Sequence, residues 1–411
     1  MKQIALVVQR YGKEVLGGAE TLAAEFAKVL KSEYDITVVT TTAKDYISWE
    51  NYYEEGESFE NDVKVVRFEP DFERTQYFHE LNRIFLNGIN TENFYRYSDA
   101  EKMLWRKNTN SIPISFQEEL IKWQGPYSSK LYNYLTLNED KFDFIIFFTY
   151  LYPTTYFGVD CINDKKKIIV FPTLHDEAHA YLPIWKKYRN CKLFFLTPEE
   201  KKLAQSLWGN LNGYVVKYGI EDKGYKYLNL NSNNEDLKEK YLIYAGRIDP
   251  AKGINDLIEN FAKYKKEYPN SKIKLKLIGK LAMDLKSDKK HGIEIIGFVS
   301  EEEKYKLMSE ALALVLPSPY ESLSIVVLES FMVGVPVIVN GACDVLTGHV
   351  NRSKAGFTYR NYNDFKNAIN KLLNDTDLNI KMKEEGRKYF LDNYEWTKYK
   401  ENLLKILNEF E

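Results

Sequence analysis

Hydrophobic positions along the chain form short continuous runs that alternate with longer amphipathic stretches. The runs at 4–8 and 144–148 are typical of parallel strands that are buried on both faces. Residues 19–30 instead gather their apolar side chains on one side, as an amphipathic helix does. This alternation predicts an α/β domain built on a parallel sheet. Its expected strands are 4–8, 36–40, 63–68, 144–148, 168–171 and 193–196.

A second alternating series begins after residue 240. Its expected strands are 242–244, 273–278, 293–296, 313–316 and 335–339. Helices are expected to fill most of 362–411. A single hydrophobic core stops growing near ~250–300 residues, so a chain of 411 residues is expected to form two domains. The polar, Asn-rich stretch 221–240 contains or closely follows their boundary. We therefore expect two doubly wound, Rossmann-like domains at about 1–215 and 216–390.

The segment 71–140 departs from this alternation, because it is helical and aromatic. It contains Trp105, Trp123 and Tyr127. We interpret it as an insertion that elaborates the first domain. Its aromatic side chains could stack on sugar rings or lipid, or they could simply pack the insertion.

Charge and apolar content exclude two classes of protein. The formal net charge of −2 gives no global basic field that would attract nucleic acid. The longest apolar candidate, 142–151, is broken by Asp143 and reads as a buried strand, and the run at 4–8 is too short for a signal peptide. The three cysteines have no C-x-x-C spacing, which suits a reduced cytoplasm. We expect a soluble cytoplasmic protein, or one that is peripheral at the inner face of the membrane.

Ligands of doubly wound sheets bind beyond the carboxyl ends of the strands. Two such domains suggest a cleft between them. The loops expected to line it follow Val8, Phe171, Ala245, Ile278 and Leu316.

The segment 317–329 carries two carboxylates, Glu321 in a loop and Glu329 in the second turn of the following helix. The unpaired N–H groups of a helix start bind phosphate or sugar oxygens. Two carboxylates there would repel phosphate, so each is better suited to accept hydrogen bonds from hydroxyl groups. A capped helix with two incidental acids would give the same pattern.

The run Gly246–Gly253 places two cations after a predicted strand. Arg247 directly follows the strand, and Lys252 precedes a helix. Two cations at the carboxyl end of a strand suit a diphosphate, although a surface salt-bridge pair would look the same. The first loop adds Gly17 and Gly18, whose backbone can approach an anion closely. No G-x-G-x-x-G occurs there, so a dinucleotide fingerprint is not supported.

The loop at 171–177 also follows a predicted strand and contains His175 and Asp176. These two residues could form an acid–base pair, and His179 could add a metal ligand. We reject a metal here, because no cysteine lies in the segment and one helical face cannot complete a site.

The combination of these motifs resembles glycosyltransferase family four. The similarity rests on the P-S-x-Y-E loop with Glu321-x₇-Glu329, on G-R-x-D-x-x-K-G at 246–253 and on G-G-A-E at 17–20. It covers nearly the whole chain. Enzymes of that family have the GT-B fold and retain the anomeric configuration of the donor. Three further segments look like a subgroup of bacterial enzymes linked to surface polysaccharide synthesis, namely 123–127, 148–153 and 172–177.

The resemblance implies a donor site centred on the second domain. Arg247 and Lys252 would neutralise the donor diphosphate. Glu329 would hold the ribose hydroxyls, and Glu321 would hold hydroxyls of the donor sugar. His175 would approach the sugar and the reaction centre. The other donor-site residues that the resemblance implies are Gly17, Gly18, Gly279, Phe298, Val299, Ser322, Leu323 and Ser324.

The resemblance also gives parts of this set separate roles. Gly18 would lie under the reacting phosphate, the loop 297–299 would touch the base, and the backbone of 322–324 would assist Glu321. Many relatives carry glycine in place of Ser322 and Ser324, so this chain could favour a different donor sugar. The first domain would bind the acceptor, and the last helix, near 391–411, would cross back to it.

The implied activity is transfer of a sugar, a hexose by expectation, from a nucleotide diphosphate sugar to a glycan or lipid-linked glycan, with no metal or other cofactor. Fixed cations and helix N-termini would stabilise the departing diphosphate. The only D-x-D, at 375–377, lies between two predicted helices and is expected to cap a helix. Two alternatives stay open: a nucleotide-sugar epimerase on the same two-domain plan, and a non-catalytic glycan- or nucleotide-binding protein. The order of the motifs speaks against the first, and the intact charged residues speak against the second.

Overall fold

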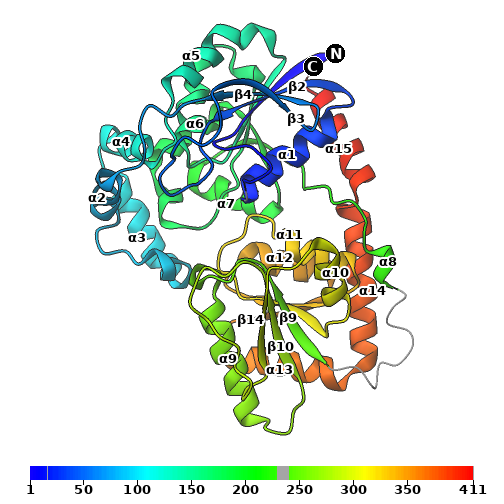
Figure 1. Ribbon diagram of the computed structural model, residues 1–411. Coiled ribbons are helices and arrows are strands. Elements are labelled where there is room, and N and C mark those ends of the chain that lie inside the picture. The colour runs from blue at the N-terminus through cyan, green and yellow to red at the C-terminus, as the bar shows by residue number, and fades with distance from the viewer. Residues whose placement is uncertain (16, 229–239, 411) are drawn as a thin grey trace. The chain divides into compact units, whose positions relative to one another are not determined.

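The computed structural model describes residues 1–15, 17–228 and 240–410 (Figure 1). The chain forms two compact units, Met1–Tyr218 and Gly219–Glu411. Part of the predicted boundary stretch, 229–239, lies outside the described residues. Among the helices that the structure describes, none is long and apolar enough to cross a membrane.

An eight-stranded sheet forms the centre of the first unit, with the order β3-β4-β2-β1-β5-β6-β7-β8. Its neighbouring strands are parallel except β3 and β4, which are antiparallel. The strands are β1 (Lys2–Val7), β2 (Tyr34–Thr41), β3 (Gly56–Glu60), β4 (Val63–Phe68), β5 (Phe144–Phe148), β6 (Ile168–Phe171), β7 (Lys192–Phe195) and β8 (Asn212–Val215).

The central strands of this sheet are apolar because both of their faces are covered. Every residue of β5 is buried, and Ile4 of β1 pairs in register with Phe144 of β5. On one face, Phe26 of α1 (Gly18–Leu30) packs edge-to-face against Phe148 and Phe171, with ring centroids 6.0 and 5.2 Å apart. The continuous apolar runs of the sequence therefore correspond to strands buried on both sides.

Three helices of the expected insertion lie together at one side of the first unit, namely α2 (Gln76–Leu86), α3 (Asp99–Thr109) and α4 (Ile114–Gln124) (Figure 1). The helix α5 (Ser129–Asn138) lies apart from them, at the top of the view. The remaining α-helices of this unit are α6 (Pro153–Tyr156) and α7 (Pro198–Trp208). Short 3-10 helices lie at Thr91–Arg96, Glu139–Lys141, Gly158–Cys161, Lys165–Lys167, Ala178–Tyr181 and Pro183–Asn190. The helical character predicted for 71–140 is confirmed.

The second unit contains a six-stranded parallel sheet with the order β11-β10-β9-β12-β13-β14. Its strands are β9 (Tyr241–Ala245), β10 (Lys274–Ile278), β11 (Ile293–Gly297), β12 (Ala313–Leu316), β13 (Val337–Asn340) and β14 (Gly356–Tyr359). Its helices are α8 (Tyr225–Leu228), the 3-10 helix Pro250–Lys252, α9 (Ile254–Glu267), α10 (Glu301–Ser309), α11 (Ile325–Met332), α12 (Asp344–Ser353), α13 (Tyr362–Asn374), α14 (Thr376–Asn393) and α15 (Trp396–Asn408).

Both units are therefore doubly wound, as the alternating pattern predicts. The three strands that the pattern missed lie at or near sheet ends. β3 is exposed along most of its length, and β8 and β14 are only partly buried, so none has a continuous apolar run. The cap expected in the D-x-D segment is confirmed, because Asp375 accepts a hydrogen bond from the Leu378 N–H at 2.9 Å.

Candidate functional site

The strand order of the second unit reverses between β9 and β12, which is the point where doubly wound sheets bind ligands. The two charged motifs of the sequence directly follow the two strands at this point. Residues 246–253 follow β9, and 317–324 follow β12. Because the two strands are neighbours and parallel, their carboxyl ends meet at one edge of the sheet.

The structure brings these two motifs into contact. Lys252 donates a hydrogen bond from Nζ to Oε1 of Glu321 at 2.9 Å. Gly253 has a φ of 77°, and a Cβ placed on it would lie 2.6 Å from the carbonyl oxygen of Pro317. Glycine at this position therefore allows both the left-handed turn and the close approach of the two loops.

The second cation of the motif is also beside a carboxylate. Arg247 Nε lies 3.0 Å from Oδ2 of Asp249, and the Arg247 side chain is 43% exposed. Its carbonyl accepts a hydrogen bond from the Tyr244 hydroxyl at 2.6 Å. Both cations thus lie at the carboxyl edge of the sheet, each in an ion pair that an incoming anion would have to share.

Glu329 is buried on α11 and accepts hydrogen bonds from side chains of a neighbouring helix. Its Oε1 accepts hydrogen bonds from Lys304 Nζ at 2.6 Å and from the Tyr305 hydroxyl at 3.1 Å, both on α10. Burial, with added effects of Glu329 and Glu301, raises the pKa of Tyr305. Within the described part of the chain, Oε2 of Glu329 has no hydrogen-bond partner. This oxygen remains able to accept a hydroxyl.

Lys304 and Tyr305 were not identified from the sequence. Their signal in the sequence is weak: Ser300 followed three residues later by Glu303 is typical of a helix start, and this helix comes directly after β11. Ser300 does cap α10, since its Oγ accepts a hydrogen bond from the Glu303 N–H at 3.2 Å. Which side chains of that helix face Glu329 depends on the packing of α10 against α11, which periodicity does not specify.

The start of α11 has a strained conformation. Ser324 precedes the helix with φ 67° and ψ 74°, in the left-handed region that favours glycine. Its Oγ is buried and has no hydrogen-bond partner among the described residues. A glycine at this position would adopt the conformation without strain, so a serine here has an energetic cost.

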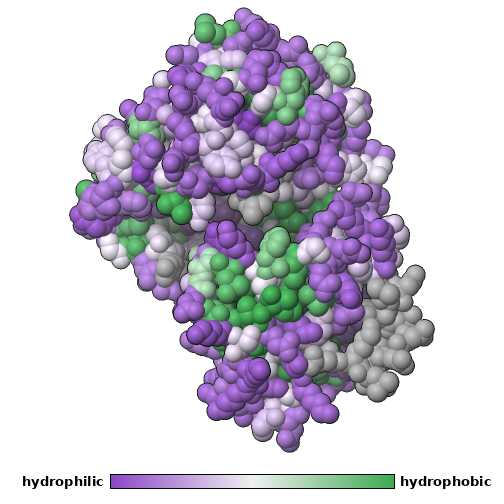
Figure 2. All heavy atoms as spheres, in the orientation of Figure 1, coloured by the Kyte–Doolittle hydropathy of each residue, from purple (hydrophilic) through white to green (hydrophobic). Residues whose placement is uncertain are grey.

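The other donor-site residues expected in the second unit lie along the same edge. Gly279 follows β10 with a φ of 134°, and its N–H donates to the Gly297 carbonyl at 2.8 Å. A Cβ on Gly279 would lie 1.8 Å from the Gly246 carbonyl oxygen, so no larger residue fits between these loops. Phe298, which precedes Val299 after β11, is 81% exposed. Figure 2 shows hydrophobic surface on the visible face of this unit.

The first unit has its own switch point between β1 and β5. Gly17 and Gly18 open α1 there, after a loop whose residue 16 lies outside the described residues. A Cβ on Gly18 would meet nothing within 4 Å, whereas a Cβ on Gly17 would lie 2.1 Å from Oε2 of Glu20. Glu20 is buried and accepts a hydrogen bond from Arg10 Nε at 2.8 Å. Gly18 alone of the two glycines therefore faces open space.

His175 lies in the loop after β6, and a buried carboxylate holds that loop. Glu200 of α7 accepts hydrogen bonds from the Leu174 N–H at 2.8 Å and the Leu196 N–H at 2.8 Å. Burial raises the pKa of Glu200 to about 8, although these backbone donors act in the opposite direction. The pattern T-P-E-E at 197–200 is typical of a helix start, and the Glu200 N–H does donate a hydrogen bond to Thr197 Oγ1. This pattern did not predict the bond to the His175 loop.

The proposed pairing of His175 with Asp176 is wrong. Asp176 accepts hydrogen bonds from Lys102 of α3 at 2.5 Å and from the Tyr181 hydroxyl at 2.7 Å. The carboxylate nearest to His175 Nδ1 is Glu177, at 4.0 Å. The backbone turns here, since the Glu177 N–H donates to the His175 carbonyl at 2.9 Å, and Asp176 reaches α3 instead.

His179, the third polar residue of this segment, packs inside the first unit. Its Nε2 lies 2.7 Å from Oδ1 of Asn82, and its ring lies 5.0 Å from that of Phe85. Burial lowers the pKa of His179. No group of three or more metal-ligating side chains is found among the residues that the structure describes.

The aromatic residues of the insertion divide into two kinds. Trp105 is buried and donates from Nε1 to the Ala178 carbonyl at 2.9 Å, so the idea that it stacks on a ligand is wrong. Trp123 and Tyr127 are only partly buried, and both lie beside Phe72, with ring centroids 4.2 and 5.9 Å from it. These two aromatic rings remain partly accessible.

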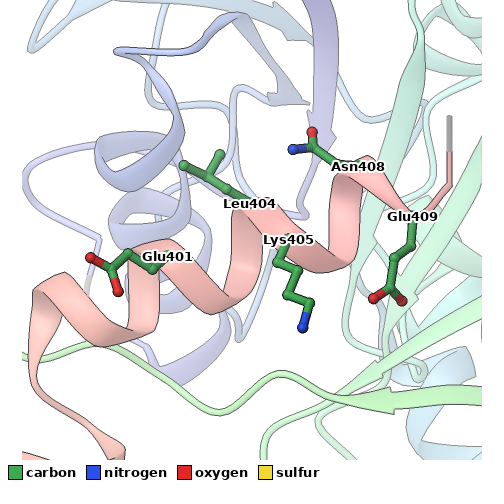
Figure 3. Close-up of a pocket in the computed structure, with 5 residues that line it drawn as sticks. All are labelled: Glu401, Leu404, Lys405, Asn408 and Glu409. Carbon is green, nitrogen blue, oxygen red and sulfur yellow. The ribbon is translucent and has the colours of Figure 1, made fainter.

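Figure 3 shows a hollow along α15, lined by Glu401, Leu404, Lys405, Asn408 and Glu409. Four of these side chains come from α15 and Glu409 directly follows it, and none belongs to a sequence motif. The hollow offers no convergent set of chemical groups, so the candidate site is placed at the strand ends.

Comparison with known proteins finds glycosyltransferases similar to part of the chain. Residues 228–389 match the family model described as glycosyl transferases group 1. An uncharacterised glycosyltransferase of Methanocaldococcus jannaschii is 27% identical over 227 residues, which cover 52% of this chain and 56% of that protein. The chain therefore matches little more than half the length of this relative.

Solved structures resemble the whole chain. Sucrose-phosphate synthase from Thermosynechococcus elongatus has a TM-score of 0.67 at 15% identity, and the match covers 100% of this chain and 99% of that one. Anabaena HepE in complex with UDP has a TM-score of 0.67 at 14% identity, with 100% of both chains covered. These matches show the GT-B fold, built from two Rossmann-like domains.

Proposed function

We propose that this chain is a retaining, metal-independent glycosyltransferase that moves a hexose from a nucleotide diphosphate sugar to a glycan or lipid-linked glycan, in the synthesis of a cell-surface polysaccharide. The observation that carries the proposal is the contact between Lys252 and Glu321 at the switch point of the second unit. It joins a cation suited to a diphosphate with a carboxylate suited to sugar hydroxyls, within the segment that matches group 1 glycosyltransferases.

The second unit binds the donor in this proposal. Arg247 and Lys252 neutralise the diphosphate, and the free Oε2 of Glu329 accepts a ribose hydroxyl. Glu321 and the backbone of 322–324 hold the sugar, while the exposed Phe298 ring and Val299 contact the base. Solved complexes of similar folds support a nucleotide-sugar donor, since HepE was solved with UDP and glucose, and a trehalose-6-phosphate protein of E. coli with UDP-2-fluoro glucose.

The reaction breaks the bond between the anomeric carbon and the diphosphate oxygen and forms a glycosidic bond on the same face. Negative charge grows on the leaving diphosphate, where fixed cations and the N–H groups at a helix start act as electrostatic catalysts. The leaving phosphate accepts the proton of the acceptor hydroxyl. His175 orients the sugar, and Gly18, with open space beside it, lets the phosphate approach the start of α1. These groups take the place of a metal ion.

The first unit binds the acceptor in this proposal. The partly exposed rings of Trp123 and Tyr127 support an acceptor site for sugar rings or a lipid carrier. The protein would work in the cytoplasm, at or near the inner face of the membrane.

A screen of nucleotide sugars tests the donor assignment. UDP-glucose, UDP-N-acetylglucosamine and GDP-mannose are added in turn, and the thermal midpoint is recorded. A ligand present at 100 times its Kd should stabilise the fold by about 2.7 kcal/mol. Incubation with the best ligand alone then separates transfer from epimerisation, because an epimerase converts the nucleotide sugar without an acceptor. No stabilisation by any of these donors would contradict the proposal.

A further inference from the structure

The peptide between Leu323 and Ser324 presents an unpaired hydrogen-bond donor at the start of α11. The N–H of Ser324 has no partner within the described ranges of the chain. The carbonyl of the same peptide, Leu323 O, lies 2.7 Å from Nε2 of His349. Since the C=O and N–H of a trans peptide point in opposite directions, the contact with His349 also sets the direction of the Ser324 N–H.

Hydrogen bonding determines which nitrogen of His349 carries the proton. Leu323 O can only accept, so Nε2 must donate to it. Nδ1 is then an acceptor, and it lies 3.2 Å from the Tyr389 hydroxyl of α14. That hydroxyl in turn accepts from Arg352 Nε at 3.1 Å. A directed chain of hydrogen bonds therefore runs from Arg352 through Tyr389 and His349 to the loop at Leu323.

His349 itself is fully buried. It belongs to α12, has an exposed fraction of 0%, and lies in ring contact with Tyr389 and Tyr394 at 6.0 and 5.9 Å between centroids. A polar side chain in such surroundings must be fully hydrogen-bonded to be tolerated, and both ring nitrogens of His349 meet this condition. The loop at Leu323 is thus fixed by a buried side chain that a ligand does not contact.

We propose that His349 is a positioning residue for the donor sugar, because it turns the Leu323–Ser324 peptide so that the Ser324 N–H faces a sugar hydroxyl. This inference rests on the proposed function, since it takes the start of α11 as the place where the sugar binds. Arg247 and Lys252 hold the diphosphate independently of this peptide. His349 therefore governs affinity for the sugar part of the donor and leaves affinity for the diphosphate unchanged.

The test compares binding of a nucleotide sugar with binding of its nucleoside diphosphate. Calorimetry gives both dissociation constants for the intact wild-type chain and for His349→Leu, using UDP-glucose with UDP or GDP-mannose with GDP, whichever pair binds the wild type. A lost hydrogen bond corresponds to roughly three- to tenfold in affinity. His349→Leu should raise the dissociation constant of the nucleotide sugar by this factor. It should change the dissociation constant of the nucleoside diphosphate by less than about twofold.

Two further variants separate positioning from general loosening. Tyr389→Phe removes the partner of Nδ1 but leaves the Nε2 bond to Leu323, so it should lower the thermal midpoint without changing the ratio of the two dissociation constants. His349→Gln keeps an amide donor that can reach Leu323 O and should restore most of the ratio, whereas the shorter His349→Asn should not. If His349→Leu does not fold, the comparison of His349→Gln with His349→Asn takes its place in the test.

The outcomes are distinct. An unchanged ratio in His349→Leu and His349→Asn overturns the positioning role and leaves the proposed function intact. The positioning role is also overturned if Tyr389→Phe changes the ratio of the two dissociation constants as much as His349→Leu does. A general loosening of the unit would then explain both results. If the wild type binds neither a nucleotide sugar nor a nucleoside diphosphate, the proposed function itself fails, and this inference falls with it.

Discussion

The ion pair between Lys252 and Glu321 allows a quantitative test of the donor site. Replacing Lys252 with methionine removes the cation and also leaves the Glu321 carboxylate unpaired beside the place proposed for the diphosphate. Replacing Glu321 with glutamine removes that negative charge and keeps the shape of the side chain. The two single variants and the double variant form a thermodynamic cycle.

The magnitude follows from the geometry. At 2.9 Å and an effective dielectric constant of about 20, the Coulomb attraction is about 6 kcal/mol before the cost of desolvation. The Lys252 side chain is 34% exposed, so water screens the pair and the net coupling is smaller. We expect a coupling of about 1–3 kcal/mol between the two positions, as is usual for residues in contact.

Calorimetry of nucleoside diphosphate binding measures this coupling. Lys252→Met should lose about 2–4 kcal/mol of binding free energy, in line with the loss of one preorganised electrostatic donor. The double variant should recover about 1–3 kcal/mol of that loss, because the unpaired carboxylate is gone. Raising the salt concentration should reduce all of these differences in binding free energy. Lys266→Met is the matched control, since Lys266 is exposed on α9 of the same unit.

Two results would refute this reasoning. If the double variant binds no better than Lys252→Met, then Glu321 does not lie close enough to the diphosphate to repel it. If Lys266→Met weakens binding as much as Lys252→Met, the effect is one of overall charge and not of the site.

Three other changes test separate parts of the structure. Burial holds the pKa of His349 at about 3, below its ordinary 6.5, so its stabilising effect is present above pH 6.5 and is lost as the pH falls toward 3. The urea-unfolding free energy should therefore drop by about 2 kcal/mol from this group between about pH 7.5 and pH 5, and His349→Leu should remove that drop. Ser324→Gly should raise the thermal midpoint by relieving about 1 kcal/mol of left-handed strain, and an unchanged or lower midpoint would count against that strain. Trp123→Ala should raise the acceptor KM and leave the donor Kd unchanged; a changed donor Kd with normal acceptor kinetics would contradict an acceptor role.

Both sheets could be predicted because their central strands are buried on two faces. Residues 144–148 and 313–316 form continuous apolar runs and became strands with those bounds. β3 could not be predicted in the same way, since its pairing with β4 occurs at an exposed edge and requires no apolar side chains. The caps at Thr197, Ser300 and Asp375 were predictable because they depend on neighbours within a few residues.

Most of the site contacts that could not be predicted from the sequence join segments far apart in the chain. The meeting of Lys252 with Glu321 could be inferred in outline, because both follow parallel strands at one sheet edge. The bond from Lys304 to Glu329 and the bond from His349 to Leu323 depend on how helices pack side by side. The partner of Asp176 was mispredicted for a related reason, since Lys102 lies 74 positions earlier in the chain.

The stereochemistry of the product tests the central claim most directly. The protein is incubated in excess EDTA with an α-linked nucleotide sugar and a glycan acceptor, and the product is examined by proton NMR. The account predicts an α-linked product and released nucleoside diphosphate, because the acceptor attacks the same face of the sugar from which the diphosphate leaves and no metal is needed. A β-linked product, an epimerised nucleotide sugar, or activity that returns only with Mn²⁺ or Mg²⁺ would contradict it.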